Sequence, residues 1–319
     1  MAQGIRIEEG RPRVVVLLGP TGAGKSKLAI EWAEELGGEI VSADSMQVYR
    51  YMDIGTAKPA VDDQKRVRHH LIDLVTPDQP FDAAHYRTLG RKTVDQLYEK
   101  ETPIWVVGGT GLYIKTLSEG IFKSPKIDPS LRENLKREAK EKGTGTLYER
   151  LKKGDPKTAF SLHPNDLFRI VRALEVLDST GIPISFYREQ HCFGEKPYAT
   201  LKIGLEMNRN VLYQRIDERV DQMLEKGFLH EVERLMEMGY GPELKPMQSL
   251  GYKQMVQYLS KEIDLDEAVR QIKRNTRRYA KRQVTWFKTD PDIRWWDAQA
   301  DRKKILLEIK SFWEEEGKA

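Results

Sequence analysis

Hydrophobic residues near the start of the chain form short unbroken runs instead of alternating with polar ones. Two such runs span residues 14–18 and 103–107, and similar but weaker runs span residues 39–44 and 199–205. Short continuous apolar runs are typical of strands that are buried on both faces, as in parallel sheets covered by helices. The pattern therefore predicts an α/β fold with a mostly parallel sheet flanked by helices.

The middle of the chain has a different pattern. Residues 119–198 contain no strand-like run, and prolines and glycines divide them into segments of helical spacing. In one segment, Ile170, Leu174 and Leu177 recur on one face. We therefore predict an all-helical domain of residues 119–198, inserted into an α/β core that consists of residues 1–118 and 199–319.

One predicted helix near the end of the chain is unusually basic. Asp264 and Glu267 have the spacing of a capping box. Positions at three- and four-residue spacing predict a packed face, namely Val269, Ile272, Thr276, Tyr279, Gln283 and Trp286. The other positions carry eight bases, namely Arg270, Lys273, Arg274, Arg277, Arg278, Lys281, Arg282 and Lys288, with no acid between Ala268 and Lys288. An ordinary solvated helix face mixes both signs. The pattern favours a nucleic acid partner, and the alternative is that the bases pair with acids of the core.

Composition narrows the class of protein. The 319 residues have a net charge of +4 and are 39% hydrophobic, which fits a globular protein of two domains. No run of about 18 apolar residues occurs and the N-terminus is polar, so we expect neither a membrane span nor a signal peptide. Cys192 is the only cysteine. This excludes internal disulfides and cysteine metal cages, and it favours a cytoplasmic location.

The strongest chemical motif directly follows the first apolar run. It fits the phosphate-binding pattern G-x-x-x-x-G-K-[ST] and comprises Gly19, Pro20, Thr21, Gly22, Ala23, Gly24, Lys25 and Ser26. Helical spacing follows, so backbone N–H groups and a helix N-terminus would surround an anion. Lys25 would supply a point charge, and Ser26 would be a ligand for Mg²⁺. The alternative is a chance glycine loop, which the flanking strand and helix disfavour.

Other features are expected near this loop. Asp44 ends the run 39–44, so it reaches the carboxyl edge of the sheet if that strand lies beside the first one. A turn or helix-cap role is the alternative for this acid. Residues 108–113 form a second glycine turn, which indicates either further backbone donors or close backbone packing. Lys58 is placed near the anion site, and Asp73 is a weak match to a Walker-B acid.

Nearly the whole chain resembles the tRNA dimethylallyltransferases, also called tRNA isopentenyltransferases. The matching motifs are G-P-T-x-x-G-K-S at Gly19, D-S-M-Q-V-Y at Asp44, M-D-I-G-T-A-K-P at Met52, V-G-G-T-G-L-Y at Val107, H-P-N-D at His163, R-A-L-E-V at Arg172, R-I-D-x-R-V-D-x-M at Arg215, L-G-Y-K-Q-M at Leu250 and Y-A-K-R-Q-V-T-W-F at Tyr279. Several of these are unusual sequences that generic P-loop enzymes lack, so the match is specific.

The resemblance implies a P-loop NTPase-like core and a defined activity. Such enzymes move a dimethylallyl group from dimethylallyl diphosphate to N6 of the adenosine on the 3′ side of the anticodon in tRNA. Diphosphate leaves and Mg²⁺ assists. The loop holds the diphosphate of the donor, which is consistent with the lack of a strong Walker-B acid. The implied partners are tRNA and dimethylallyl diphosphate, without a membrane, and the implied state is a monomer.

The resemblance also assigns roles by motif. Asp44 would be the general base, while Thr21 and Arg219 would hold the diphosphate end of the donor. The residues implied to contact the tRNA are Asp44, Ser45, Met46, Gln47, Thr110, Arg132, Phe168, Arg169, Ile170, Val171, Arg172, Gln248, Ser249, Leu250, Gly251, Tyr252 and Lys253. Many relatives have Q-R-x-x-R at the positions of residues 168–172. Here Phe168 replaces the glutamine, while Arg169 and Arg172 remain.

Three other functions are alternatives to this one. The lack of a clear Walker-B acid disfavours a small-molecule kinase, and Asp44 at the sheet edge disfavours a non-catalytic RNA-binding module. An adenylate isopentenyltransferase that acts on free nucleotide would not need the basic helix.

Overall fold

The computed structural model describes residues 10–122, 127–191, 193–298 and 300–314, so Cys192 lies outside the described residues. The chain divides into two compact units, one made of Met1–Ser118 with Lys196–Ala319 and the other of Glu119–Glu195. The second unit ends at Glu195 and not at 198 as predicted. The reason is packing, because Tyr198 is only 7% exposed and belongs to the core of the first unit.

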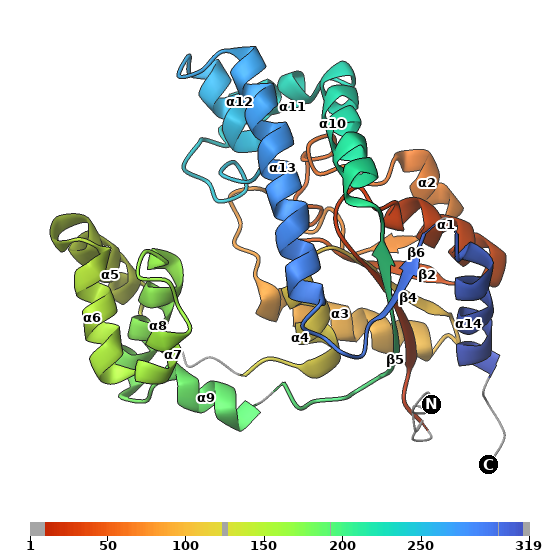
Figure 1. Ribbon diagram of the computed structural model, residues 1–319, viewed down its shortest axis with the longest axis horizontal. Helices are drawn as coiled ribbons and strands as arrows, with labels where there is room; N and C mark the ends of the chain where they lie inside the picture. The colour runs from red at the N-terminus through yellow and green to blue at the C-terminus, as the bar shows by residue number, and fades with distance from the viewer. Residues whose placement is uncertain (1–9, 123–126, 192, 299, 315–319) are drawn as a thin grey trace. The chain divides into compact units, whose positions relative to one another are not determined.

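The first unit contains a six-stranded sheet in the order β3-β2-β4-β1-β5-β6 (Figure 1). The strands are β1 (Arg13–Leu18), β2 (Glu39–Ala43), β3 (His69–His70), β4 (Ile104–Gly108), β5 (Ala199–Glu206) and β6 (Arg294–Asp297). Every pair is parallel, which confirms the predicted fold class. β2 does not lie beside β1, because β4 lies between them. Leu18 and Ala43 both pair with Gly108, so these strands still end at one edge.

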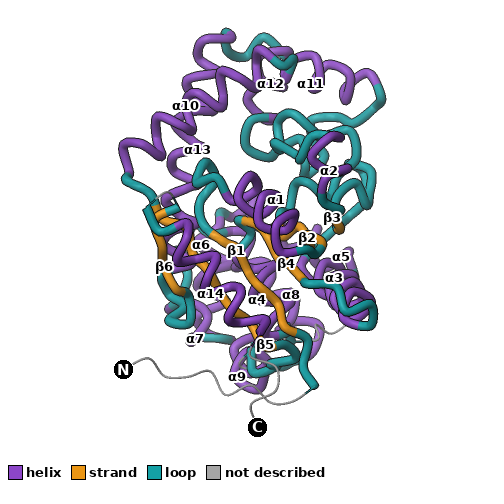
Figure 2. The backbone as a smooth tube through the Cα atoms, turned by 90° about the vertical axis from the view of Figure 1, so that its right-hand side faces the viewer, coloured by secondary structure: helices purple, strands orange, loops and turns teal. Residues whose placement is uncertain are grey.

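Helices cover both faces of this sheet. Those that precede the second unit are α1 (Lys25–Leu36), α2 (Val61–Arg66), α3 (Ala83–Tyr98) and α4 (Gly111–Glu119). Those that follow it are α10 (Arg209–Glu225), α11 (Phe228–Glu237), α12 (Tyr252–Leu259), α13 (Leu265–Phe287) and α14 (Arg302–Glu314). In Figure 2, α1 and α14 lie on the viewer's side of the strands.

The alternating side chains of β1 explain why its sequence is apolar throughout. Val15 and Leu17 pack with α1 and α14 in one core cluster. Val14, Val16 and Leu18 pack in the other, with side chains from α3 and α4. A strand that is buried on both faces cannot alternate with polar residues, as the apolar run predicted.

The long helices α10 and α13 pack against each other through charged as well as apolar contacts. Asp217 of α10 pairs with Arg277 at 2.5 Å, and Asp221 pairs with Lys273 at 2.6 Å. Asp264 caps α13 as predicted, since its Oδ1 accepts the N–H of Glu267 at 2.7 Å. Among the described residues, no helix is both long and apolar enough to cross a membrane.

The second unit is built from helices in the part of it that is described. They are α5 (Pro129–Lys142), α6 (Thr144–Gly154), α7 (Pro156–Phe160), α8 (Leu167–Thr180) and α9 (Ile184–His191). Leu147, Leu151, Ile170 and Leu174 are fully buried in its own core cluster. Separate cores are the physical reason for two units, because each buries its apolar surface without the other.

Candidate active site

The predicted phosphate-binding loop connects β1 to α1. Gly24 occupies the N-cap position of α1 with φ at 87°, a left-handed conformation that glycine adopts without strain. No side chain caps this helix, and its first turn contains no acid. The first N–H groups of α1 are therefore open to a ligand, and the helix dipole places partial positive charge there. This arrangement suits an anion.

Lys25 is turned toward its own loop. Its Nζ donates hydrogen bonds to the carbonyl oxygens of Gly19 at 2.9 Å and Pro20 at 2.8 Å. Burial and then the positive charge of Arg219 lower the pKa of Lys25, Asp44 opposes both, and the result is a pKa of about 7. Burial also lowers the pKa of Arg219, and again Asp44 opposes the shift. The fold thus brings together Lys25, Asp44 and Arg219, the charged residues to which the resemblance assigns the reaction.

Asp44 comes directly after β2, at the edge where the loop opens. Its Oδ1 accepts backbone N–H groups of Met46 at 2.8 Å and Gln47 at 3.4 Å. The turn role and the base role are therefore compatible, because among the described residues no donor is bonded to Oδ2. A carboxylate fixed by one oxygen can accept a proton on the other.

Gln283 of α13 is a site residue that the sequence reasoning placed only on a packed face. Its Oε1 accepts the N–H of Thr21 at 2.9 Å, and its Nε2 donates to the carbonyl of Gly109 at 2.8 Å. The side chain is 6% exposed, so it joins the phosphate loop to the second glycine turn inside the protein. A polar side chain on a buried helix face needs hydrogen-bond partners inside the protein. A glutamine at a packed position was therefore the sequence signal that could have identified Gln283.

We expect Gln283→Leu to raise the donor KM about tenfold, because a loop N–H and a buried carbonyl lose their partner. Steady-state kinetics well below the melting temperature would measure this change. Ile272→Val is the matched control, since it loosens the same helix by roughly 0.5–1.5 kcal/mol without touching the loop. An equal rise in KM in both variants would show that Gln283 acts through stability alone.

The second glycine turn packs closely against α13. A Cβ at Gly109 would collide with Gln283, and one at Gly111 would collide with Trp286. The N–H of Thr110 is bonded to the carbonyl of Ala43 at 3.1 Å. The Thr110 hydroxyl accepts the N–H of Ser45 at 3.0 Å, so it orients the turn that carries Asp44.

The residues after Asp44 are less available than predicted. Gln47 is buried, with its side chain bonded to the Ser42 hydroxyl at 3.0 Å and the Ala57 carbonyl at 3.3 Å. A Gln47 side chain in this arrangement cannot contact a nucleotide, because both ends of its amide are bonded internally. Met46 packs against the apolar core. Contacts of Ser45 and Met46 with RNA stay predictions.

Lys58 and Asp73 belong to a structural ion-pair cluster. Lys58 contacts Asp53 at 2.5 Å and Asp73 at 2.6 Å, so it serves these acids and not the phosphate loop. The adjoining backbone is held by Glu231 of α11, whose carboxylate accepts the N–H groups of Asp53, Ile54 and Gly55 at 2.6–3.1 Å. The sequence reasoning missed Glu231, because its partners are about 180 residues away in the chain.

In the second unit, two of the three predicted RNA-contacting arginines bond to one buried acid. Glu175 is 1% exposed and accepts two hydrogen bonds from Arg132, at 2.7 and 2.6 Å, and one from Arg172. Arg169 pairs with Asp166 at 2.7 Å. These guanidinium groups are partly neutralised, so their contacts with RNA stay predictions.

Within residues 168–172, the prediction of RNA contacts is wrong for two buried side chains. Ile170 and Val171 are buried in the core of the second unit. Their neighbour Phe168 is 72% exposed and has the freedom to contact a ligand. In the first unit, Gly251 and Tyr252 are also buried, and the Tyr252 hydroxyl donates to Glu231 at 2.6 Å. Gln248 and Lys253 remain exposed in that segment.

Ser26, the predicted Mg²⁺ ligand, is exposed on the first turn of α1. Among the described residues, no three histidine, cysteine, aspartate or glutamate side chains gather in a way that could hold a metal ion. A hydroxyl beside an anion site suits a Mg²⁺ ion that keeps several waters and takes its other ligands from the anion.

Comparison with known proteins gives one consistent family. Residues 47–290 match the sequence pattern of the family described as IPP transferase. A tRNA dimethylallyltransferase of Desulfosudis oleivorans is 52% identical over 302 residues, which cover 95% of this chain and 96% of the relative.

Solved structures agree with the sequence match. A full-length tRNA isopentenylpyrophosphate transferase from Bacillus halodurans has a TM-score of 0.70 and 38% identity, covering 95% of this chain and 96% of its own. Crystal structures of a eukaryotic dimethylallyltransferase acting on tRNA match at a TM-score of 0.81 and 29% identity, covering 94% of this chain and 79% of the other. Since these matches extend over most of its length, the chain belongs to the IPP transferase family.

Proposed function

We propose that this protein transfers a dimethylallyl group from dimethylallyl diphosphate to N6 of the adenosine on the 3′ side of the anticodon in tRNA. The observation that carries the proposal is the meeting of Asp44, Lys25 and Arg219 at one edge of the sheet. A base lies there beside two cations and an open helix N-terminus, which is the charge pattern that this transfer needs. Family membership supplies the substrate class.

In the reaction, the N6 nitrogen forms a bond to C1 of the dimethylallyl group while the bond from C1 to the diphosphate oxygen breaks. The electron pair of that bond leaves with diphosphate. Asp44 accepts the proton that N6 loses, a role that is commonly worth about 10²–10⁴ in rate. An exocyclic amine is a weak nucleophile, so neutralising the leaving group is the larger task of the site.

That task falls to the loop and its neighbours. Lys25 would exchange the Gly19 and Pro20 carbonyls for diphosphate oxygens, with Arg219 from α10 and the first N–H groups of α1 as further donors. Thr21 would contact the diphosphate through its hydroxyl, since its N–H is bonded to Gln283. Preorganised donors aimed at a leaving oxyanion are a large source of rate enhancement.

Mg²⁺ would add positive charge at the departing diphosphate. Ser26 would hold it, together with diphosphate oxygens and water, as its exposed hydroxyl beside the loop allows. The requirement for Mg²⁺ is part of the proposal, and so is a monomeric state. A cytoplasmic location is also proposed, because the tRNA substrate is found there.

The RNA must deform for this chemistry to occur. Asp44 is half-buried at the sheet edge, so the target adenosine has to leave its stack to reach it. Anticodon loops are suitable, because unpaired bases there can be turned outward at little cost. The lysines and arginines of α13 that have no carboxylate partner among the described residues would bind RNA phosphates. The arginines of the second unit would do the same.

A direct assay tests the proposal. Purified protein, dimethylallyl diphosphate with a radiolabelled dimethylallyl group and an anticodon stem-loop should give labelled RNA, and inosine at the target position should abolish labelling because it lacks the exocyclic amine. In one parallel reaction, AMP replaces the RNA as the acceptor. In another, ATP and a small-molecule acceptor are supplied to test for phosphoryl transfer. Labelling of AMP in place of RNA, or phosphoryl transfer from ATP, would overturn the proposed function.

A further inference from the structure

Glu231 of α11 anchors the turn of residues 53–57, which lies far from it in the chain. Its Oε2 accepts the N–H groups of Asp53 at 2.9 Å and Ile54 at 2.6 Å, and its Oε1 accepts that of Gly55 at 3.1 Å. Hydrogen bonds to an ionised carboxylate are about twice as strong as those between neutral groups. One side chain therefore fixes three successive N–H groups of this turn.

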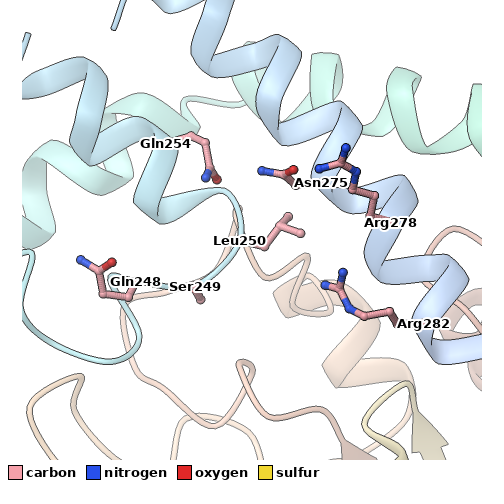
Figure 3. Close-up of a pocket in the computed structure, with 7 residues that line it drawn as sticks. All are labelled: Gln248, Ser249, Leu250, Gln254, Asn275, Arg278 and Arg282. Carbon is pink, nitrogen blue, oxygen red and sulfur yellow. The ribbon is translucent and has the colours of Figure 1, made fainter. Parts of the chain in front are cut away.

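The same turn is seated in a corner between α11 and α12. A Cβ at Gly55 would lie 2.2 Å from the ring of Phe228 in α11 and 2.7 Å from the ring of Tyr252 in α12. The Tyr252 hydroxyl donates to Glu231 at 2.6 Å, so both helices hold the turn and its carboxylate. Figure 3 shows the pocket that residues 248–250 and Gln254 form with α13, and neither Glu231 nor the turn lines it. Glu231 therefore acts on the turn and not as part of that pocket.

From this turn, hydrogen bonds lead to the proposed base. The Nε2 of Gln47 donates to the carbonyl of Ala57 at 3.3 Å, and its Oε1 accepts the Ser42 hydroxyl at 3.0 Å. The N–H of Gln47 donates to the Oδ1 of Asp44 at 3.4 Å. Gln47 is 8% exposed, so these internal bonds set its position. The orientation of Asp44 thus depends on the turn that Glu231 anchors.

The backbone on both sides of this turn is strained. Four of the seven described non-glycine residues with positive φ are close together in the chain, namely Tyr51, Ala57, Leu71 and Asp73, with φ between 49° and 70°. L-residues other than glycine rarely adopt this left-handed region, and it persists only where the surrounding structure holds it. Ala57 is the residue whose carbonyl binds Gln47, so part of this strain lies on the path to Asp44. Strain that a bonded network maintains is typical of sites that require a fixed geometry.

Lys58 holds the strained segment from within. Its Nζ donates to the carbonyl of Tyr49 at 2.9 Å and contacts Asp53 at 2.5 Å and Asp73 at 2.6 Å, and its side chain is 3% exposed. The side chain of Asp53 is thus held by Lys58, while its N–H is held by Glu231. The turn is therefore fixed through both its side chains and its backbone.

We propose that Glu231 is a positioning residue for prenyl transfer, which holds the turn of residues 53–57 so that Gln47 keeps Asp44 oriented toward the N6 proton. The proposal rests on the proposed function, since it takes Asp44 as the base. Glu231 acts through the turn and Gln47, and not by contact with a substrate. A base must lie within hydrogen-bond reach of the proton that it removes. A small displacement of Asp44 would therefore slow the chemical step without weakening the binding of donor or RNA.

The first test compares full-length Glu231→Gln with wild type in single-turnover reactions at saturating donor and anticodon stem-loop. Glutamine has nearly the same shape, but its amide nitrogen cannot accept the N–H groups that one carboxylate oxygen accepts. The rate should fall about tenfold, while the donor KM and the RNA affinity change by less than about twofold. A wild-type rate in this variant would overturn the proposal.

Val232→Ala is the matched control for Glu231→Gln. Val232 is the next residue of α11 and is fully buried in the core, so its truncation weakens the packing of the same helix. The hydrogen bonds of Glu231 stay in place in this variant. Its single-turnover rate should equal that of wild type well below the melting temperature. An equal loss of rate in the two variants would show that Glu231 acts through stability alone.

A double-variant cycle asks whether Glu231 acts through Asp44. In the Asp44→Asn background the proposed base is absent, so Glu231→Gln should cause little further loss of rate. Gln47→Leu should slow transfer about as much as Glu231→Gln, and the two changes together should cost no more than either alone, because they lie on one path. A full further loss in the Asp44→Asn background would overturn the proposal, since Glu231 would then act independently of the base.

Hydrogen exchange tests the same path without any substrate. The amide hydrogens of Met46 and Gln47, which donate to Asp44, should exchange about tenfold faster in Glu231→Gln than in wild type or Val232→Ala. Unchanged exchange at these two amides would contradict the positioning role. If wild type labels no RNA at all, the proposed function itself is wrong, whereas the exchange rates still decide whether Glu231 holds Asp44 in place.

Discussion

Asp44→Asn should lower the turnover of prenyl transfer by about 10² or more, while the affinities for donor and RNA change by only a few-fold. Asparagine keeps an oxygen that can accept the Met46 N–H, so the turn after β2 should survive. The change removes the second carboxylate oxygen, which is the proton acceptor in the proposed reaction. Single-turnover kinetics at saturating donor and RNA would measure the effect directly.

Asp82→Asn is the matched control for this substitution. Asp82 caps α3 through the N–H groups of Ala84 and His85, and asparagine caps helices about as well as aspartate. Its turnover should equal that of wild type. If Asp44→Asn also reacted at the wild-type rate, another group would have to accept the N6 proton.

Lys25→Ala should lower kcat/KM for the donor by about 10²–10³, the effect expected when one donor to a developing oxyanion is lost. RNA affinity measured without donor should stay unchanged, because the loop is proposed to bind diphosphate and not RNA. Lys27→Ala is the matched control, since Lys27 is an exposed lysine of the same helix. A large loss of donor-free RNA affinity in Lys25→Ala would mean that the loop binds an RNA phosphate.

The pH profile gives an independent check on the same lysine. Burial lowers the pKa of Lys25 to about 7, so in the free protein this amine is charged below that pH and neutral above it. Diphosphate favours the charged form, so donor binding above pH 7 takes up a proton. The donor KM of the wild type should therefore rise with pH above 7, by up to about tenfold per pH unit. Lys25→Ala should lack this rise, and a flat wild-type profile would contradict the assignment.

Local sequence was sufficient for the elements that depend on local physics. Apolar runs predicted the buried strands, since β1 has to present apolar side chains to both faces. The phosphate loop was predictable because its conformation depends on glycines at fixed positions, such as Gly24 at the start of α1. Asp44 was predictable as an edge residue, because the carboxyl ends of parallel strands meet at one edge. The family was recognisable from its motifs.

Long-range contacts decided how these parts are used. The sequence from Arg270 to Lys288 shows eight bases and no acid, yet Asp217 and Asp221 of α10 neutralise two of them. Gln283 resembled any polar residue on a packed face until the fold placed it between Thr21 and Gly109. Ile170 and Val171 belonged to a motif implied to bind RNA, but in the fold they are buried in the hydrophobic core of the second unit.

There is a physical reason why local sequence predicted some features and long-range contacts decided the others. Backbone conformation and the periodicity of burial are set by neighbours within a few residues, so the sequence by itself determined β1, β2, β4 and β5, the phosphate loop and the acid at the sheet edge. Hydrogen-bond and ion-pair partners are set by which surfaces meet in three dimensions. Only the tertiary structure could therefore decide that the second glycine turn packs against α13, and that Arg278 and Arg282 have no carboxylate partner among the described residues.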